Sequence, residues 1–189
     1  QFVNSAIPTG KENHVTIVKN MLPQEREFML YLPLYDGIDK LEIGIDPGAE
    51  IVASELNSPD RENPIVMYGT SILQGASASR PGMAATNIIG RRFDREVVNL
   101  GFSANAFLDK EIAELMSEVE ASAYVLDFVP NASVSQIKEL TIPFYRILRK
   151  KHRTTPIIFV EDPQFPSAVY NRVLADEIRE KNEALQLVP

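Results

Sequence analysis

The sequence predicts an α/β protein in which a parallel sheet with flanking helices follows a small antiparallel β domain. Two patterns carry this prediction. Before residue 54, apolar and polar residues alternate at close spacing, which is typical of β-hairpins. After residue 63, short apolar runs alternate with amphipathic stretches of helix length, which indicates parallel strands joined by crossover helices. The polar, turn-rich segment 55–63 separates the two patterns, so we predict domains at 1–58 and 59–189.

The composition is that of a globular chain, and it excludes several classes of protein. Of the 189 residues, 44% are hydrophobic and 24% are charged, and no apolar run is long enough for a membrane span. The net charge is −7 and the longest basic stretch is Arg149-Lys150-Lys151, so no nucleic-acid partner is expected. Cysteine is absent and histidine occurs only as His14 and His152. Because zinc sites are usually built from these two residue types, we expect no metal and no other cofactor, although the residue counts leave open a magnesium or calcium site made of carboxylates alone.

The N-terminal domain, 1–58, is predicted to be β-sandwich-like and built from antiparallel hairpins. Turn signals stand at Asp36-Gly37 and at Asp46-Pro47-Gly48, between runs in which every second residue is apolar. These apolar positions are Val15 and Ile17, then Phe28, Leu30 and Leu32, then Leu41, Ile43 and Ile45.

Four strands and four helices are predicted after the boundary. The strands are the apolar runs 65–68, 97–100, 124–128 and 157–160, and the helices cover roughly 82–93, 108–118, 133–151 and 168–186. Ser133 and Gln136 form a capping-box signature at the start of the third helix, and Pro143 predicts a kink within it. The last helix is predicted to bury one face, formed by Val169, Val173, Leu174, Ile178 and Leu185.

Ligands of an open parallel sheet bind at the carboxyl ends of the strands, so the residues that follow each strand are the candidate site. They are the segments 69–75, 101–105, 130–131 and 161–162. Ser71 stands at a strand-to-helix turn, where backbone amides can stabilise an oxyanion, and Asn131 adds a side-chain donor. This arrangement suits acyl transfer. It is not the G-x-S-x-G elbow, because Leu73 occupies the place of the second glycine.

Three blocks resemble the SGNH (GDSL-like) hydrolases, a family of esterases and lipases on a flavodoxin-like fold. The G-D-S-L block is similar to Gly69-Thr70-Ser71-Ile72, and the two later blocks resemble 98–104 and 127–131. The resemblance implies that Ser71 is the nucleophile. It implies an oxyanion hole made of the Ser71 N–H, the Ala104 N–H and the Asn131 side chain. Gly69, Thr70 and Asn105 are then candidate substrate-binding residues.

One branch of the family is more similar still. In that branch G-T-S-I-x-Q-G continues into S-R-P-G-M, as it does here up to Met83, and a β-rich N-terminal domain contains L-Y-L-P-L-Y, matched by 30–35. The resemblance implies deacylation or deacetylation of a carbohydrate or small ester, in a secreted or periplasmic protein. The family has glycine where this chain has Ala104. If that position requires a positive φ, alanine is strained there.

The fourth block of the family, Asp-x-x-His, supplies the acid and the base, and the sequence does not contain it. His152 is predicted at the amino edge of the sheet and His14 lies in the N-terminal domain, so neither is a candidate base. The family has a fifth strand, which 185–189 approaches. We therefore expect the chain to stop before the segment with the base, and these 189 residues alone to be weakly active or inactive.

Less specific interpretations remain open for each candidate. Ser71 is also a possible helix N-cap, Asn131 a possible cap of the helix that begins near Ser133, and Asn105 equally a turn residue. The structural interpretation is favoured for three further features: Arg80 as a turn anchor, Glu161-Asp162 as a solvated pair without a role, and Tyr31 with Tyr35 as an interdomain packing face. The alternative function is a non-catalytic carbohydrate- or protein-binding module that has lost its base.

Overall fold

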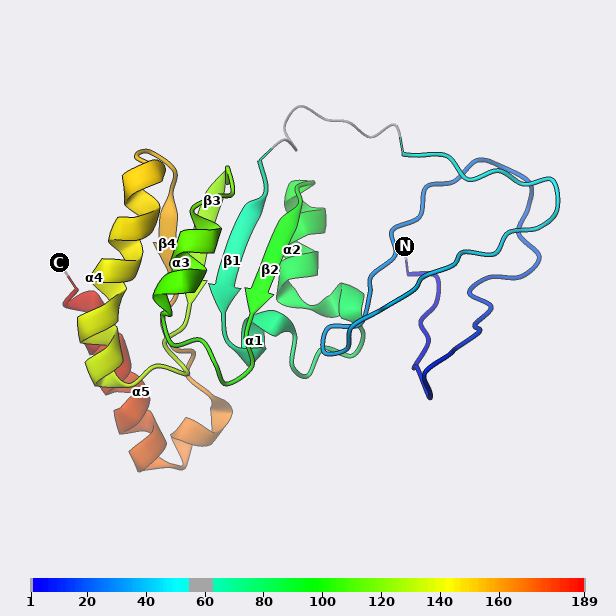
Figure 1. The fold of residues 1–189 in the computed structure, drawn as a ribbon. Coiled ribbons are helices and arrows are strands. Elements are labelled where there is room, and N and C mark those ends of the chain that lie inside the picture. Colours follow the sequence, from blue (N-terminus) through cyan, green and yellow to red (C-terminus); the bar gives the residue numbers. More distant parts are fainter. Residues whose placement is uncertain (1, 55–62, 189) are drawn as a thin grey trace.

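The computed structural model describes residues 2–54 and 63–188. Its centre is a four-stranded sheet made of β1 (Ile65–Gly69), β2 (Val97–Gly101), β3 (Ala123–Asp127) and β4 (Ile157–Phe159), as Figure 1 shows. The strand order is β2-β1-β3-β4 and every pair is parallel. This is the flavodoxin-like order over four strands, and it confirms the predicted parallel sheet.

Five helices and two single turns of 3-10 helix connect the strands in the part of the chain that is described. They are α1 (Ser71–Gln74), η2 (Pro81–Met83), α2 (Ala85–Phe93), α3 (Lys110–Met116), α4 (Val134–Lys151), η3 (Pro166–Val169) and α5 (Arg172–Gln186). Helix α3 packs against α4 and α4 against α5, whereas α2 packs against β2. Right-handed crossovers in this strand order place α2 on one face of the sheet and α3 to α5 on the other. No described helix is long and apolar enough to cross a membrane.

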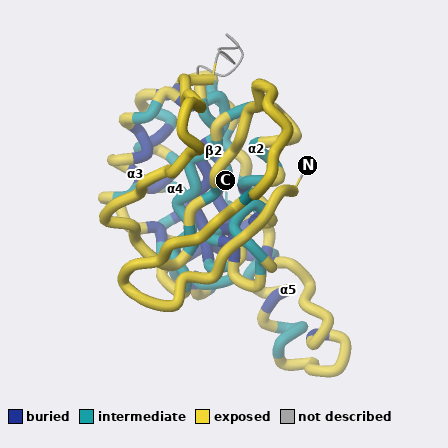
Figure 2. Tube along the Cα trace, turned by 90° about the vertical axis from the view of Figure 1, so that its right-hand side faces the viewer, coloured by how far each residue is buried: buried dark blue, intermediate teal, exposed yellow. Residues whose placement is uncertain are grey.

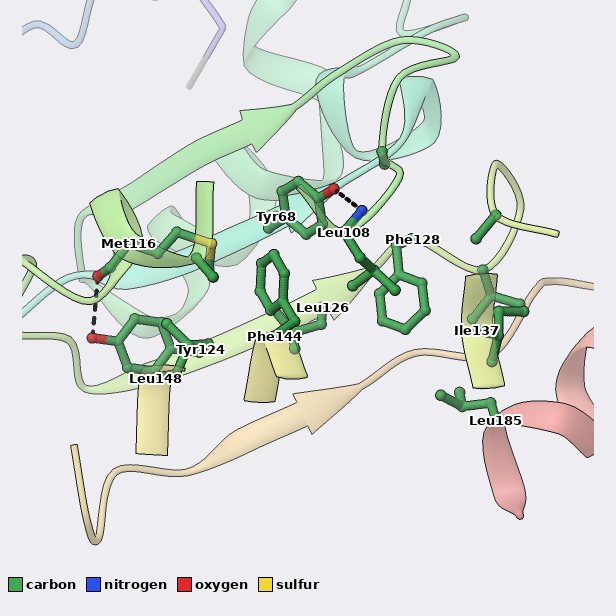
Figure 3. Close-up of a cluster of buried hydrophobic side chains, with 14 of the residues drawn as sticks. Tyr68, Leu108, Met116, Tyr124, Leu126, Phe128, Ile137, Phe144, Leu148 and Leu185 are labelled. Carbon is green, nitrogen blue, oxygen red and sulfur yellow. Dashed lines mark hydrogen bonds between the residues drawn. The ribbon is translucent and has the colours of Figure 1, made fainter. Parts of the chain in front are cut away.

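The hydrophobic core lies between the sheet and helices α3 and α4. Tyr68 of β1 stacks on Phe144 of α4 with ring centroids 5.2 Å apart, and both side chains are buried (Figure 3). The Tyr68 hydroxyl accepts a hydrogen bond from the Leu108 N–H at 2.9 Å, which fixes the loop that follows β2. The core therefore holds the loops at the carboxyl edge of the sheet as well as the layers themselves.

Helix α4 agrees with the predicted helix in extent, whereas α5 ends as predicted at Gln186 but begins at Arg172, four residues later than predicted. In α4 the Ser133–Gln136 capping box is present, and the helix continues from Val134 to Lys151 with Pro143 inside it. The predicted apolar face of this last helix is wrong at its beginning, because Val169, which lies in η3, and Val173 of α5 are 71% and 78% exposed. The start of α5 projects beyond the sheet (Figure 1), so periodicity there has no layer to pack against.

The N-terminal part differs from the prediction, because the described residues 2–54 contain no strand and no helix. The expected antiparallel β domain is therefore not shown. Residues 2–54 form long open loops to one side of the α/β part (Figure 1) and are exposed over almost their whole length (Figure 2), including Phe28 and Ile43 of the alternating runs. Alternation decides which side chains would share a face, but a sheet also needs a paired strand and a covering layer. The proposed boundary and most of the predicted linker, 55–62, lie outside the described residues.

Tyr31 connects this segment to the α/β part. Its hydroxyl accepts a hydrogen bond from Arg91 Nη1 at 2.9 Å, and its ring lies under the same guanidinium group at 5.3 Å. The ring also covers Gly82, where an added Cβ would lie 3.0 Å from it. Tyr31 is thus a packing residue, which is the role that the sequence favoured.

Candidate active site

The first part of the candidate site is the turn between β1 and α1. Thr70 caps α1: its buried hydroxyl oxygen accepts a hydrogen bond from the Ile72 N–H at 3.3 Å. Ser71 is therefore the first residue of the helix and not its N-cap, so the capping alternative for Ser71 is wrong. No described residue bonds to the Ser71 hydroxyl or accepts from the Ser71 N–H. A serine with these two free groups is suited to nucleophilic attack.

Gly69 and Thr70, the candidate substrate-binding residues of this turn, are both buried. A Cβ at Gly69 would lie 2.6 Å from the carbonyl oxygen of Asp127 on the neighbouring strand. Glycine is thus required for β1 and β3 to approach each other, and threonine for the cap. The structure gives both residues a role in positioning Ser71.

The loop after β2 holds Ala104 in the left-handed region, with φ of 56°. As expected from the sequence, a positive φ at this position is unfavourable for alanine. The cost relative to glycine is on the order of 1–2 kcal/mol. Within the described chain, the Ala104 N–H has no acceptor. The preceding amide, Ser103 N–H, donates to Gln74 Oε1 at 2.9 Å, and Asn99 Oδ1 accepts from Gly101 N–H at 2.9 Å. The loop therefore presents one free donor between anchored neighbours.

Asn131 follows β3 and supplies a third free donor. Its Oδ1 accepts from the Ala106 N–H at 3.3 Å, which fixes the amide, while Nδ2 has no partner among the described residues. The cap of α4 is Ser133, whose hydroxyl accepts from Gln136 N–H at 3.2 Å. The capping alternative for Asn131 is therefore wrong.

Asn105 lies elsewhere. It is exposed and its Nδ2 donates to the Ser103 carbonyl at 2.8 Å; like its neighbour Ala104, it is not among the residues that line the cavity holding Ser71. Its contacts are those of a turn residue, which was the alternative to substrate binding.

A cavity of about 420 Å³ opens at the carboxyl edge of the sheet. Its lining includes Ser71 after β1, Asn131 after β3, Asp162 after β4, and residues of α5. Three of the four strand ends that the sequence selected thus contribute to one cavity. Phe165, Leu174 and Ile178 add apolar side chains to the lining.

Asp162 is the residue of this cavity that the sequence interpretation missed. It is only 6% exposed, and within the described chain its Oδ1 is buried without a hydrogen-bond partner. Its backbone is bonded to Asn182 of α5 by two hydrogen bonds, of 2.7 and 3.0 Å. Burial raises the pKa of Asp162, and the nearby Lys181 ammonium partly opposes this. The prediction of a solvated pair is correct for the exposed Glu161 and wrong for Asp162.

Asp127, at the end of β3, is a second buried carboxyl at this edge. Burial, and then the proximity of Asp162, raises the pKa of Asp127 from 3.8 to about 7. Asp127 and Asp162 both lie at strand ends, as Asn131 does, so the rule that ligands bind at the carboxyl ends of strands applies to them too. The sequence does not show, however, whether an aspartate is buried.

Neither histidine lies at the cavity. His152 caps the end of α4 and is buried, with Nε2 2.9 Å from the Ser117 carbonyl and its ring 5.2 Å from that of Tyr124 near the amino end of β3. His14 is exposed and pairs with Glu12 at 3.1 Å. Both placements agree with the expectation that neither histidine serves Ser71. Among residues 2–54 and 63–188, no group of three His, Cys, Asp or Glu side chains is placed to hold a metal ion.

The strand order and the serine turn place the chain in the SGNH class of α/β folds. The chain belongs to the GDSL-like Lipase/Acylhydrolase family: the family model matches residues 62–188, and a model for the N-terminus of SGNH-hydrolase-type esterases matches residues 1–51. This confirms the resemblance seen in the sequence. Members of the family are typically carboxylic ester hydrolases.

Solved structures that are similar to the chain include the following two. A protein from Bacteroides ovatus ATCC 8483, assigned as a GDSL-like lipase, is 40% identical with a TM-score of 0.77, over 82% of this chain. The salicylyl-acyltransferase SsfX3 from a tetracycline biosynthetic pathway is 20% identical with a TM-score of 0.55, over 69% of this chain, and supports the fold alone. The chain spans 45% and 39% of these two proteins' own lengths. No curated protein matches it.

Proposed function

We propose that the chain carries the nucleophile and oxyanion hole of a serine ester hydrolase. The observation that carries the proposal is the set of free groups at one sheet edge. The hydroxyl and N–H of Ser71 have no partner in the described residues, and neither do the N–H of Ala104 and the Nδ2 of Asn131. Unpaired donors at a nucleophile suit the negative charge that develops on a carbonyl oxygen during acyl transfer.

In the proposed reaction, Ser71 Oγ attacks the ester carbonyl carbon while a base takes the hydroxyl proton. The carbonyl oxygen becomes an oxyanion held by the three donors. Collapse of this intermediate breaks the bond to the alcohol, which leaves with the proton, and water then releases the acyl group from Ser71 by the same route in reverse.

The catalytic base must also be proposed, because neither His14 nor His152 lies at the cavity. We propose that it is the histidine of an Asp-x-x-His segment outside these 189 residues, as the family resemblance implies. A small acyl group on a carbohydrate, and a secreted or periplasmic location, are also proposals that rest on the same resemblance.

The test is labelling of the complete gene product with a fluorophosphonate probe, followed by intact-mass measurement. We expect a single adduct that disappears in Ser71→Ala, and a loss of esterase activity by a factor of at least about 10³ in the same variant. Ser77→Ala, at another serine of the α1 region, checks that labelling is selective.

An unlabelled protein, or an adduct that survives in Ser71→Ala, would contradict the proposal. If the complete gene also lacked Asp-x-x-His and Ser71→Ala bound ligand as well as the natural protein, the chain would be the binding module described above.

A further inference from the structure

The N-terminal segment contacts the serine turn and α1 through residues 34–35. The Leu34 carbonyl accepts a hydrogen bond from Gln74 Nε2 at 3.1 Å. The Tyr35 hydroxyl donates to the Ser71 carbonyl at 3.5 Å. The Leu34 side chain covers Gly75, where an added Cβ would lie 2.6 Å from Leu34 Cδ1. A segment distant in sequence thus contacts both ends of the one-turn helix that carries the nucleophile.

Gln74 connects this contact to the loop that follows β2. Its Nε2 donates to Leu34, while its Oε1 accepts from the Ser103 N–H at 2.9 Å. Ser103 directly precedes Ala104, whose φ of 56° is unfavourable for a residue with a Cβ. Gly101, the last residue of β2, lies against Gln74 so closely that a Cβ there would be 2.7 Å from that of Gln74. The Gln74 side chain therefore links the N-terminal segment to the loop 102–106, which we call the oxyanion loop because it contains Ala104.

An unfavourable backbone conformation persists only where its surroundings determine it. The hydrogen bond from Ser103 N–H to Gln74 Oε1 restrains the backbone next to Ala104. It can do so only if the Gln74 side chain is itself held in place. Helix α1 is four residues long and cannot fix that side chain by itself. The Leu34 carbonyl supplies the second point that sets the orientation of the Gln74 amide.

The geometry points to Gln74 as a positioning residue, and to residues 34–35 as a strap that sets the oxyanion loop through it. The N-terminal region is on this view a working part of the catalytic centre. The inference rests on the proposed function, since it concerns the donor that Ala104 supplies.

Two variants of the complete gene product separate the two hydrogen bonds of Gln74. Gln74→Met removes both at nearly constant volume. Gln74→Glu keeps an acceptor for Ser103 but loses the donor to Leu34. With p-nitrophenyl acetate as the probe, we expect kcat to fall at least about tenfold in Gln74→Met with KM unchanged within about twofold, because a misplaced oxyanion donor acts on the transition state. Gln74→Glu should fall between Gln74→Met and the natural protein.

Hydrogen exchange gives a second readout that needs no turnover. In Gln74→Met the amides of 101–106 should exchange faster, and in Gln74→Glu the Ser103 amide should recover part of its protection. The control is Gln186→Met, at an exposed glutamine of α5 whose Nε2 donates to Glu161 Oε1 at 2.6 Å, and it should leave kcat and the exchange of 101–106 unchanged.

A kcat in Gln74→Met equal to that of Gln186→Met would overturn the inference. A kcat in Gln74→Glu equal to that of the natural protein would overturn the role of the strap. Loss of kcat together with loss of cooperative thermal unfolding would make Gln74 a folding residue and would also overturn it. Failure of the proposed function is distinct, because the activity would then survive in Ser71→Ala whatever Gln74 does.

Discussion

At the scale of single residues, the site depends on which polar groups are left without a partner. Thr70 takes the cap that Ser71 was a candidate for, and Ser133 takes the cap that Asn131 was a candidate for. Because these two neighbours are the caps, the Ser71 hydroxyl and the Asn131 Nδ2 stay free at the cavity. The sequence places these residues at strand ends correctly, but neighbouring residues of similar capping ability can be told apart only by the hydrogen bonds that they make.

Ala104 is the residue whose backbone carries a cost. In Ala104→Gly we expect the free energy of unfolding to rise by about 1 kcal/mol, because glycine adopts positive φ without strain, and esterase activity to be retained. Urea unfolding measures the change. Ala175→Gly, in the interior of α5, is the control and should shift stability in the opposite direction by about 0.5–1 kcal/mol. A loss of stability in Ala104→Gly would show that the loop is not strained at this residue.

At the scale of elements, close contacts between α1 and its neighbouring strands position the nucleophile. The helix is a single turn, so its position depends on two glycines at strand ends. Gly69 lets β1 approach Asp127 of β3, and Gly101 lets β2 approach Gln74 of α1. The sequence shows a glycine at the end of each of these strands. It does not show why glycine is needed there, because the atoms that exclude a Cβ belong to segments far away along the chain.

Gly101 gives the strictest test of this packing. A Cβ there would lie 2.3 Å from the Gln74 backbone nitrogen, so α1 must move if Gly101→Ala is to fold. We expect a loss of about 3 kcal/mol or more in the free energy of unfolding, measured by urea titration. Gly44→Ala, where nothing lies within 4 Å, should stay within about 0.5 kcal/mol. Equal small effects in both variants would contradict the close contact.

At the scale of the whole molecule, two buried carboxyls tie stability to pH. The pKa of Asp127 is raised from 3.8 to about 7, so between these values the folded chain keeps a proton that the unfolded chain has lost. The folded state then binds more protons, and stability falls as the pH rises through this window. Asp162, whose pKa is also raised, acts in the same direction.

Asp127→Asn isolates the contribution of one carboxyl. At pH 8 we expect this variant to exceed the natural protein in unfolding free energy by on the order of 2 kcal/mol, with a difference near zero at pH 4. Urea titrations at the two pH values measure it. Asp39→Asn, at an exposed carboxyl, should leave the pH dependence unchanged. A variant as pH-sensitive as the natural protein would show that Asp127 is not the group responsible.

The sequence by itself determined the parallel α/β sheet, the limits of α4, and the strand-end positions of Ser71 and Asn131. These follow from apolar periodicity and from the rule that parallel strands present their carboxyl ends at one edge, and both are properties of local sequence. Only the tertiary structure decided that Asp162 is buried, that Ala104 has a positive φ, and that residues 2–54 form no strand. Burial, backbone strain and strand pairing depend on atoms brought together from distant parts of the chain, and a one-dimensional pattern does not contain them.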